Sequence, residues 1–197
     1  IAQCLVGSEM CIETDYIIAT FHPVTTQPGE EERQTKALLE SLDGIIKDGW
    51  KVLFTMPNSD TGGKTVANLI REWASKKAQS VKAVSSLGRL KYYSALQHAS
   101  AVVGNSSSGL IEAPSFGIPT LNIGDRQKGR AQGDSVVNCG TKKEEITEGL
   151  KKVLSDEFRS TAQNATNPYE KEGTLQSILQ PLLHAPLPST KTFHDLH

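Results

Sequence analysis

The residues best suited to chemistry in this sequence form one run, Gly-Asn-Ser-Ser-Ser-Gly-Leu-Ile-Glu at positions 104–112. The run follows a short apolar stretch and leads into a helical pattern. Free backbone N–H groups should therefore gather at a helix start, where the helix dipole favours an anion. Glycine and serine leave room for a ligand, and the sequence has no Gly-Lys-Ser/Thr signature of a Walker loop. We interpret this run as a phosphate cradle without lysine.

Two plainer interpretations apply to the same run. Ser108 alone is a good N-cap for the helix that follows, and Glu112 could close a capping box. Glu112 also lies one helical turn after Ser108, close enough to the mouth of the loop to accept hydrogen bonds from a ribose diol. The combination favours a nucleoside diphosphate over a bare helix cap.

A second polar segment, Asp-Arg-Gln-Lys-Gly-Arg at positions 125–130, carries three cations in five residues. Arginine presents a fork that binds two phosphate oxygens at once. A solvated charge cluster is the usual explanation of such a segment. Its position directly after a short strand favours phosphate binding here.

Histidine and aspartate offer acid–base groups elsewhere in the chain. His22 stands beside Pro23 after a strand, where a lone histidine is more often structural, although its ordinary pKa suits proton transfer near neutral pH. Asp60 is a weaker candidate, since a turn-forming aspartate explains it equally well. We interpret His98 as structural. The three remaining histidines carry no functional signal: His184, His194 and His197.

Composition excludes several classes of protein. The 197 residues carry a net charge of −1, which argues against a nucleic-acid binder or a polybasic membrane protein. No apolar run reaches membrane-spanning length. The three cysteines, Cys4, Cys11 and Cys139, form no metal-like pair and suit unpaired thiols in a reducing compartment. We therefore expect a cytoplasmic protein with no metal site, no cofactor, no membrane and no nucleic-acid partner.

Strand-like and helix-like segments alternate along the chain, which predicts crossover units and a parallel sheet. The fold class is α/β, a Rossmann-like doubly wound sheet that binds ligands beyond the carboxyl ends of its strands. We expect strands at residues 16–21, 50–56, 81–84, 101–103, 119–123 and 135–137. We expect helices at residues 29–48, 64–77, 90–98, 110–116, 142–154 and 174–183.

We expect a single domain at residues 16–185, between an N-terminal lead-in at 1–15 and a loose tail at 186–197. The N-terminus has neither an initiator methionine nor a signal-peptide pattern, so we expect it to be an edge cut from a longer chain.

Residues 104–130 closely resemble the UDP-binding segment of UDP-N-acetylglucosamine 2-epimerases. The resemblance is to the hydrolysing type, found in bacterial sialic-acid biosynthesis and in the epimerase half of bifunctional epimerase/kinases. Thr-Phe-His-Pro-Val-Thr at 20–25 matches that type. Non-hydrolysing enzymes usually carry His-Arg at 22–23 and Asp-Ser-Gly-Gly at 105–108. Shorter resemblances lie at residues 57–63 and 167–169.

The similarity runs from about residue 16 to about residue 183. It implies the glycosyltransferase-B arrangement, in which two Rossmann-like domains enclose the active site between them. This chain would be the C-terminal, nucleotide-holding domain, and its partners would be the missing N-terminal domain, UDP and a UDP-sugar. The full-length protein would be a homo-oligomer.

The resemblance implies that His22 is the catalytic residue, which donates a proton to the departing UDP phosphate or stabilises it. Ser106 and Ser107, with nearby amides, would hold the diphosphate, and Glu112 would bind the ribose hydroxyls. Arg126 would bind phosphate.

The resemblance also places an aromatic ring against uracil at Tyr92, where stacking suits a flat base. Helix packing is the alternative for Tyr92 and for Tyr93. The remaining expected UDP contacts are Asn58, Ser86, Leu87, Asn105, Ser108 and Gly109.

The implied reaction is elimination of UDP from UDP-N-acetylglucosamine across C1–C2, followed by addition of water to the glycal to give N-acetylmannosamine. Carboxylates of the N-terminal domain would supply the base that takes the C2 proton. We therefore expect this 197-residue chain to bind UDP weakly and to turn over nothing by itself.

Three alternatives stay open. The same domain could serve a UDP-diacetamido sugar or an epimerase that does not hydrolyse. It could belong to a glycosyltransferase-B transferase, whose C-terminal domain also holds a nucleotide with a glutamate. It could also be a non-enzymatic interaction or regulatory domain. Because the loop after Asn58 departs from the pattern of the bifunctional enzymes, we expect no feedback inhibition by CMP-sialic acid.

Overall fold

The computed structural model describes residues 15–58 and 60–185 of the chain. A six-stranded sheet, parallel throughout, runs through the molecule in the order β3-β2-β1-β4-β5-β6. The strands are β1 (Tyr16–Thr20), β2 (Lys51–Thr55), β3 (Val81–Val84), β4 (Ala101–Gly104), β5 (Thr120–Ile123) and β6 (Val136–Cys139). The expected doubly wound α/β fold is confirmed.

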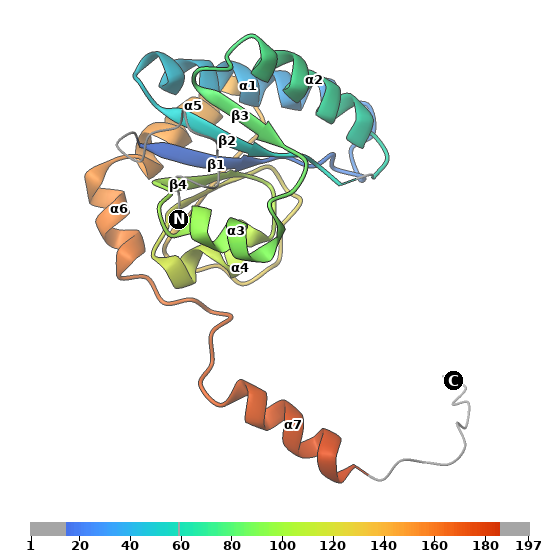
Figure 1. Ribbon diagram of the computed structural model, residues 1–197, viewed down its shortest axis with the longest axis vertical. Helices are drawn as coiled ribbons and strands as arrows, with labels where there is room; N and C mark the ends of the chain where they lie inside the picture. Colours follow the sequence, from blue (N-terminus) through green and yellow to red (C-terminus); the bar gives the residue numbers. More distant parts are fainter. Residues whose placement is uncertain (1–14, 59, 186–197) are drawn as a thin grey trace.

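Helices cover both faces of the sheet (Figure 1). The α-helices are α1 (Glu31–Lys47), α2 (Gly63–Ser75), α3 (Gly88–Leu96), α4 (Ser108–Ile111), α5 (Lys143–Val153), α6 (Asp156–Gln163) and α7 (Thr174–His184), and a 3-10 helix, η2, spans Ala113–Phe116. Helices α1, α2 and α5 pack on one face, where Leu38, Ile70 and Leu150 are buried against the strands. Helix α3 and η2 cover the other face through Leu96 and Ala113.

The winding of the sheet reverses between β1 and β4. The chain runs outward from β1 to β3, crosses back to β4 beside β1, and then runs outward to β6. A ligand site is expected where the winding reverses, because the two neighbouring loops turn to opposite faces of the sheet and leave a crevice. The last matched pair of β1 and β4 is Thr20 with Gly104, so the loops that begin there define the crevice.

Gly104 is required at this junction. Its φ is +134°, a region that favours glycine, and a Cβ built on it would lie 1.9 Å from the Thr20 carbonyl oxygen. The absence of a side chain therefore lets the end of β4 close on the end of β1.

The expected element order is confirmed, with ends that shift by one or two residues. The helix expected at 110–116 is instead divided into α4 and η2, because Pro114 lies in the first turn of η2 and has no backbone N–H to continue an α-helix. Helix α6 was not expected. It follows the N-cap Ser155, whose hydroxyl accepts from the Phe158 N–H, and its eight residues include two apolar ones, Phe158 and Ala162, which are few to reveal a helix.

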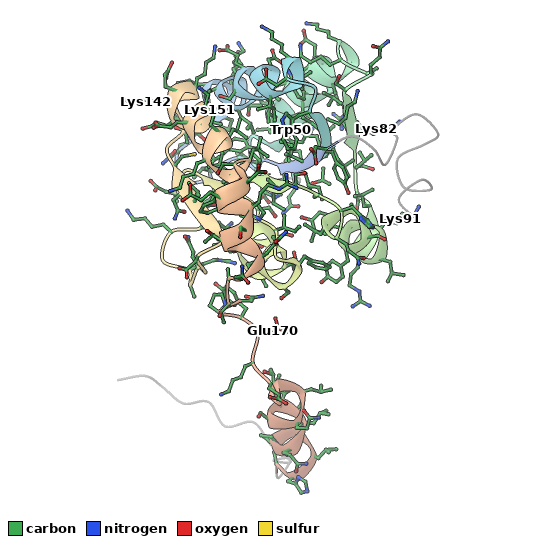
Figure 2. The ribbon with its side chains drawn as sticks, turned by 90° about the vertical axis from the view of Figure 1, so that its left-hand side faces the viewer. Trp50, Lys82, Lys91, Lys142, Lys151 and Glu170 are labelled. Atoms are coloured by element: carbon green, nitrogen blue, oxygen red, sulfur yellow. The ribbon has the colours of Figure 1, made fainter. Side chains whose placement is uncertain are left out.

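Helix α7 stands apart from the body of the molecule (Figures 1 and 2). It has no buried residue, and Leu182 is 70% exposed. In the described part of the chain, no helix combines the length and the apolar character needed to cross a membrane. The expected lead-in and tail lie outside the described residues, together with Cys4, Cys11, His194 and His197.

Candidate functional site

A cleft of about 490 Å³ opens at the carboxyl edge of β1, β2, β3 and β4. It is the place that the topology predicts for a ligand. The sequence-predicted site residues that line it are His22, Asn58, Ser86, Leu87, Tyr92, Ser106, Ser108 and Glu112. The other expected residues, Asn105, Ser107, Gly109 and Arg126, lie outside its lining.

The phosphate cradle is the turn between β4 and α4. In the described residues, the backbone N–H groups of Ser106 and Ser107 have no protein acceptor, so both are free to donate to a ligand. The Ser106 hydroxyl accepts from the Ser108 N–H at 3.4 Å. Gly109 is buried, and a Cβ there would lie 2.6 Å from the Thr120 methyl carbon. The glycine therefore lets the helix start sit directly on β5.

The two plainer interpretations of this run do not hold in the structure. Ser108 is the first residue of α4 rather than its N-cap, and its hydroxyl pairs with the Tyr92 hydroxyl at 2.7 Å. Ser107 occupies the N-cap position without a side-chain capping bond, and Glu112 closes no capping box. Glu112 lies at the other end of this short helix and lines the cleft, so its carboxylate is available to a ligand.

His22 lies at the base of the cleft and is 6% exposed. Its Nδ1 accepts a hydrogen bond from the Asn58 backbone N–H at 3.2 Å, which assigns the proton of the neutral ring to Nε2. Burial is the main cause that lowers the pKa of His22 to about 4, the Arg126 guanidinium acts in the same direction, and the charge of Asp60 opposes them. At neutral pH the imidazole is therefore uncharged and offers Nε2–H as a hydrogen-bond donor.

Of the three cations at 125–130, Arg126 is the one that turns toward the site. It is half-buried, and its Nη1 donates to the Asn105 carbonyl at 3.1 Å. Lys128 and Arg130 are exposed, and neither lines the cleft. The solvated interpretation fits those two residues, whereas Arg126 lies within electrostatic reach of His22.

Two tyrosines form one wall of the cleft. Tyr92, a residue of α3, packs against the core that lies beneath this helix, and burial raises the pKa of its hydroxyl. The Tyr93 ring lies 5.7 Å from the Phe116 ring between centroids. Both rings pack within the protein, as the helix-packing alternative predicts, and both also line the cleft. Stacking of Tyr92 on uracil stays a prediction.

The structure adds residues that sequence reasoning missed. Thr20 and Thr55 end neighbouring strands, share a hydrogen bond between their hydroxyls, and line the cleft. Arg89 also lines it and is exposed. The sequence did hold a signal for Thr20 and Thr55, because each is a threonine near the end of a predicted strand.

The other titratable candidates lie outside the cleft. Asp60 is exposed and acts on His22 only through its charge. His98, expected to be structural, is exposed just after α3. Within residues 15–58 and 60–185, no cluster of three or more His, Cys, Asp or Glu side chains is placed to hold a metal ion.

Comparison with known proteins decides the family. The family model for UDP-N-acetylglucosamine 2-epimerase matches residues 4–183. The chain belongs to this family. The resemblance seen in residues 104–130 is thereby confirmed across most of the chain.

Two curated relatives show the extent of the similarity. The chain is 31% identical over 184 residues to "Polysialic acid biosynthesis protein P7" of Escherichia coli, covering 92% of this chain and 46% of that protein. It is 32% identical over 151 residues to "GDP/UDP-N,N'-diacetylbacillosamine 2-epimerase (hydrolyzing)" of Campylobacter jejuni, covering 77% and 38%. The chain thus spans less than half the length of these relatives.

Solved structures of the family share the fold. A Methanocaldococcus jannaschii UDP-GlcNAc 2-epimerase in complex with UDP-GlcNAc and UDP superposes with a TM-score of 0.67 at 15% identity, covering 93% of this chain and 48% of that one. A Staphylococcus aureus MnaA–UDP structure gives a TM-score of 0.64 at 16% identity, covering 86% and 44%. The α/β architecture of this chain is therefore that of the epimerases.

Proposed function

We propose that this chain is the UDP-binding half of a hydrolysing UDP-N-acetylglucosamine 2-epimerase. The observation that carries the proposal is the cleft itself, in a member of the epimerase family. A buried histidine, a free carboxylate and the unpaired N–H groups of a helix start all belong to this one region at the reversal of the sheet. This set of groups suits a nucleoside diphosphate better than any uncharged ligand.

Each part of UDP would meet a matching surface. The backbone N–H groups of Ser106 and Ser107 would bind the diphosphate, with Arg126 adding positive charge. Glu112 would accept hydrogen bonds from the ribose hydroxyls, and uracil would lie against the wall that Tyr92 and Leu87 form.

His22 would act on the leaving phosphate through Nε2–H. With the pKa that the surrounding protein groups give it, the ring is a hydrogen-bond donor at neutral pH rather than a proton donor. A bound diphosphate brings negative charge beside the ring, which raises the pKa of the imidazole toward neutrality. Proton transfer to the departing UDP would then become feasible when the ligand is in place.

The reaction would be elimination of UDP across C1–C2, followed by addition of water to the glycal to give N-acetylmannosamine. The base that takes the C2 proton would lie on a domain outside this chain. We therefore expect the 197-residue chain to bind UDP and to release no amino sugar, while the full-length protein performs both steps.

Titration calorimetry of the 197-residue chain with UDP tests the site directly. Glu112→Gln should weaken UDP binding about tenfold, because a charged acceptor for the ribose is lost. Glu148→Gln, an exposed acid on α5, is the matched control and should leave UDP affinity unchanged. Absence of heat at millimolar UDP would refute the site and favour a non-enzymatic domain.

A UDP-diacetamido sugar is the second candidate substrate, because the Campylobacter jejuni relative is named for such a sugar. A product assay on the full-length protein with both UDP-sugars separates the two. Release of free amino sugar with UDP supports hydrolysis, and a retained UDP-sugar product would show epimerisation without hydrolysis. Transfer that depends on an acceptor would show a transferase instead.

A further inference from the structure

Asn105 is fully buried, with 0% exposure, at the reversal point of the sheet. Its side-chain oxygen accepts from the His22 backbone N–H at 2.7 Å, and its side-chain nitrogen donates to the His22 carbonyl at 2.8 Å. The side chain thus pairs with both backbone groups of a single residue. In effect it continues the pairing of β1 and β4 beyond Thr20 and Gly104, where the backbone ladder ends.

The backbone of Asn105 is equally occupied. Its N–H donates to the Thr20 carbonyl at 3.1 Å. Its carbonyl accepts from Arg126 Nη1 at 3.1 Å and from Gln127 Nε2 at 2.8 Å. Asn105, the first residue after β4, therefore holds both the loop that carries His22 and the loop that carries Arg126. Each of its polar atoms already has a protein partner.

We propose that Asn105 is a positioning residue rather than a nucleotide ligand, and that it sets the position of His22, which lines the cleft, relative to Arg126, which lies just outside the lining. This role rests on the proposed function only for the identity of the ligand. The pairing itself requires a side chain with one donor and one acceptor at fixed spacing. An aspartate carboxylate would supply acceptors alone and leave the His22 carbonyl without a donor.

The position of His22 decides its charge. Burial is the first cause of its lowered pKa, the Arg126 guanidinium from the loop after β5 acts in the same direction, and Asp60 from the loop after β2 opposes them. Arg89 and Glu112 line the same cleft. When the Asn105 side chain is removed, its two hydrogen bonds to the His22 backbone are lost. The loop that carries His22 should then become more exposed to water and less fixed relative to Arg126. The imidazole would then regain its ordinary tendency to bind a proton.

The test is an NMR titration of the His22 imidazole in the 197-residue chain. Asn105→Ala should raise the His22 pKa by about one unit or more toward the ordinary value of 6.5. It should also weaken UDP binding about tenfold. An unchanged His22 pKa in a folded Asn105→Ala chain would overturn the proposal.

Asn167→Ala is the matched control. Asn167 is also buried, and its amide donates to the Ile111 carbonyl at 2.8 Å and accepts from the Tyr169 N–H at 3.0 Å. Its loss should lower stability as the loss of Asn105 does, yet leave the His22 pKa unchanged. An equal shift in both variants would mean that the effect is general loosening of the fold, and would overturn the proposal.

A measurement on the unaltered chain decides the matter if Asn105→Ala does not fold. The His22 amide proton, held by Asn105, should exchange with solvent about 100-fold more slowly than an unprotected amide. Fast exchange would show that Asn105 does not hold the His22 backbone, and would overturn the proposal. A chain that binds no UDP would refute the proposed function, whereas the His22 titration and the amide exchange need no ligand and would still decide the role of Asn105.

Discussion

The loops that surround the cleft fall into two groups with different construction. We name the loops after β1, β4 and β5 the tied loops, and the loops after β2 and β3 the open loops. In the tied loops His22, Asn105 and Gln127 are buried and bonded to one another's loops. In the open loops Asn58 and Ser86 are exposed, and the Ser86 hydroxyl accepts from the N–H of nearby Gly88 at 3.2 Å.

The difference matches what each side would hold under the proposed function. A diphosphate is bound by donors at fixed positions, and buried groups with complete hydrogen bonding keep such positions. A flat base needs a surface against which to stack, and an exposed loop can adjust to it. The Asn58 N–H, which donates to His22 Nδ1, joins the two groups of loops. We infer that the tied loops set the chemistry and that the open loops admit the ligand.

The largest expected effect comes from breaking the junction of the tied loops. Gly104→Ala should destabilise the chain by about 3 kcal/mol or more, because its φ of +134° and the Thr20 carbonyl leave no place for a Cβ. Chemical denaturation measures it. Gly44→Ala, in the last turn of α1 with open space around it, is the control and should stabilise by about 0.5–1 kcal/mol. A loss at Gly104 below about 0.5 kcal/mol would contradict a tight junction.

The second effect is a pH dependence of stability that belongs to His22. Because its pKa falls from 6.5 in the unfolded chain to about 4 in the folded chain, the unfolded chain binds more protons between these pH values. The contribution of His22 to the free energy of unfolding is therefore fully present above about pH 6.5. It decreases by on the order of 2–3 kcal/mol as the pH falls toward 4.

Denaturation at several pH values checks this loss, which His22→Gln should remove. His98→Gln, at an exposed site, should leave it in place. A slope that is the same in both variants would assign the pH dependence to other groups.

The smallest effect is expected in the open loops. Ser86→Ala should change the free energy of unfolding by less than about 0.5 kcal/mol, because the side chain is exposed and makes only a local bond. UDP affinity should change less than about threefold, since the backbone of this loop is expected to meet the base. A loss of more than 1 kcal/mol would show that the open loops are as firmly held as the tied ones.

Most of the fold followed from patterns that are local in sequence. Apolar spacing predicted the helices around Leu38 and Ile70, and alternation of strands with helices predicted the parallel sheet. The exceptions have local causes as well. Pro114 divides an expected helix, and α6 has eight residues of which two, Phe158 and Ala162, are apolar, too few for a period to be recognised.

The site was predictable to the extent that its residues follow strands. His22, Ser106 and Glu112 could be assigned to one edge of the sheet, because the carboxyl ends of parallel strands meet there. Arg89 escaped, since an arginine in such a loop has no distinctive spacing, and Thr55 escaped although its place at the end of β2 was a usable signal. The burial of Asn105 could not be foreseen, because in the sequence it is one polar residue of a loop rich in serine.

The sequence by itself determined the order of strands and helices, the family, and the edge of the sheet where a ligand belongs. These properties depend on the spacing of apolar residues and on a long specific segment, both of which are written along one stretch of chain. Only the tertiary structure decided that Asn105 binds His22 rather than facing a ligand, and that the imidazole is neutral. Both depend on burial and on contacts between residues that are far apart in the chain. His22 and Asn105 are 83 positions apart, and they come close to each other only after folding.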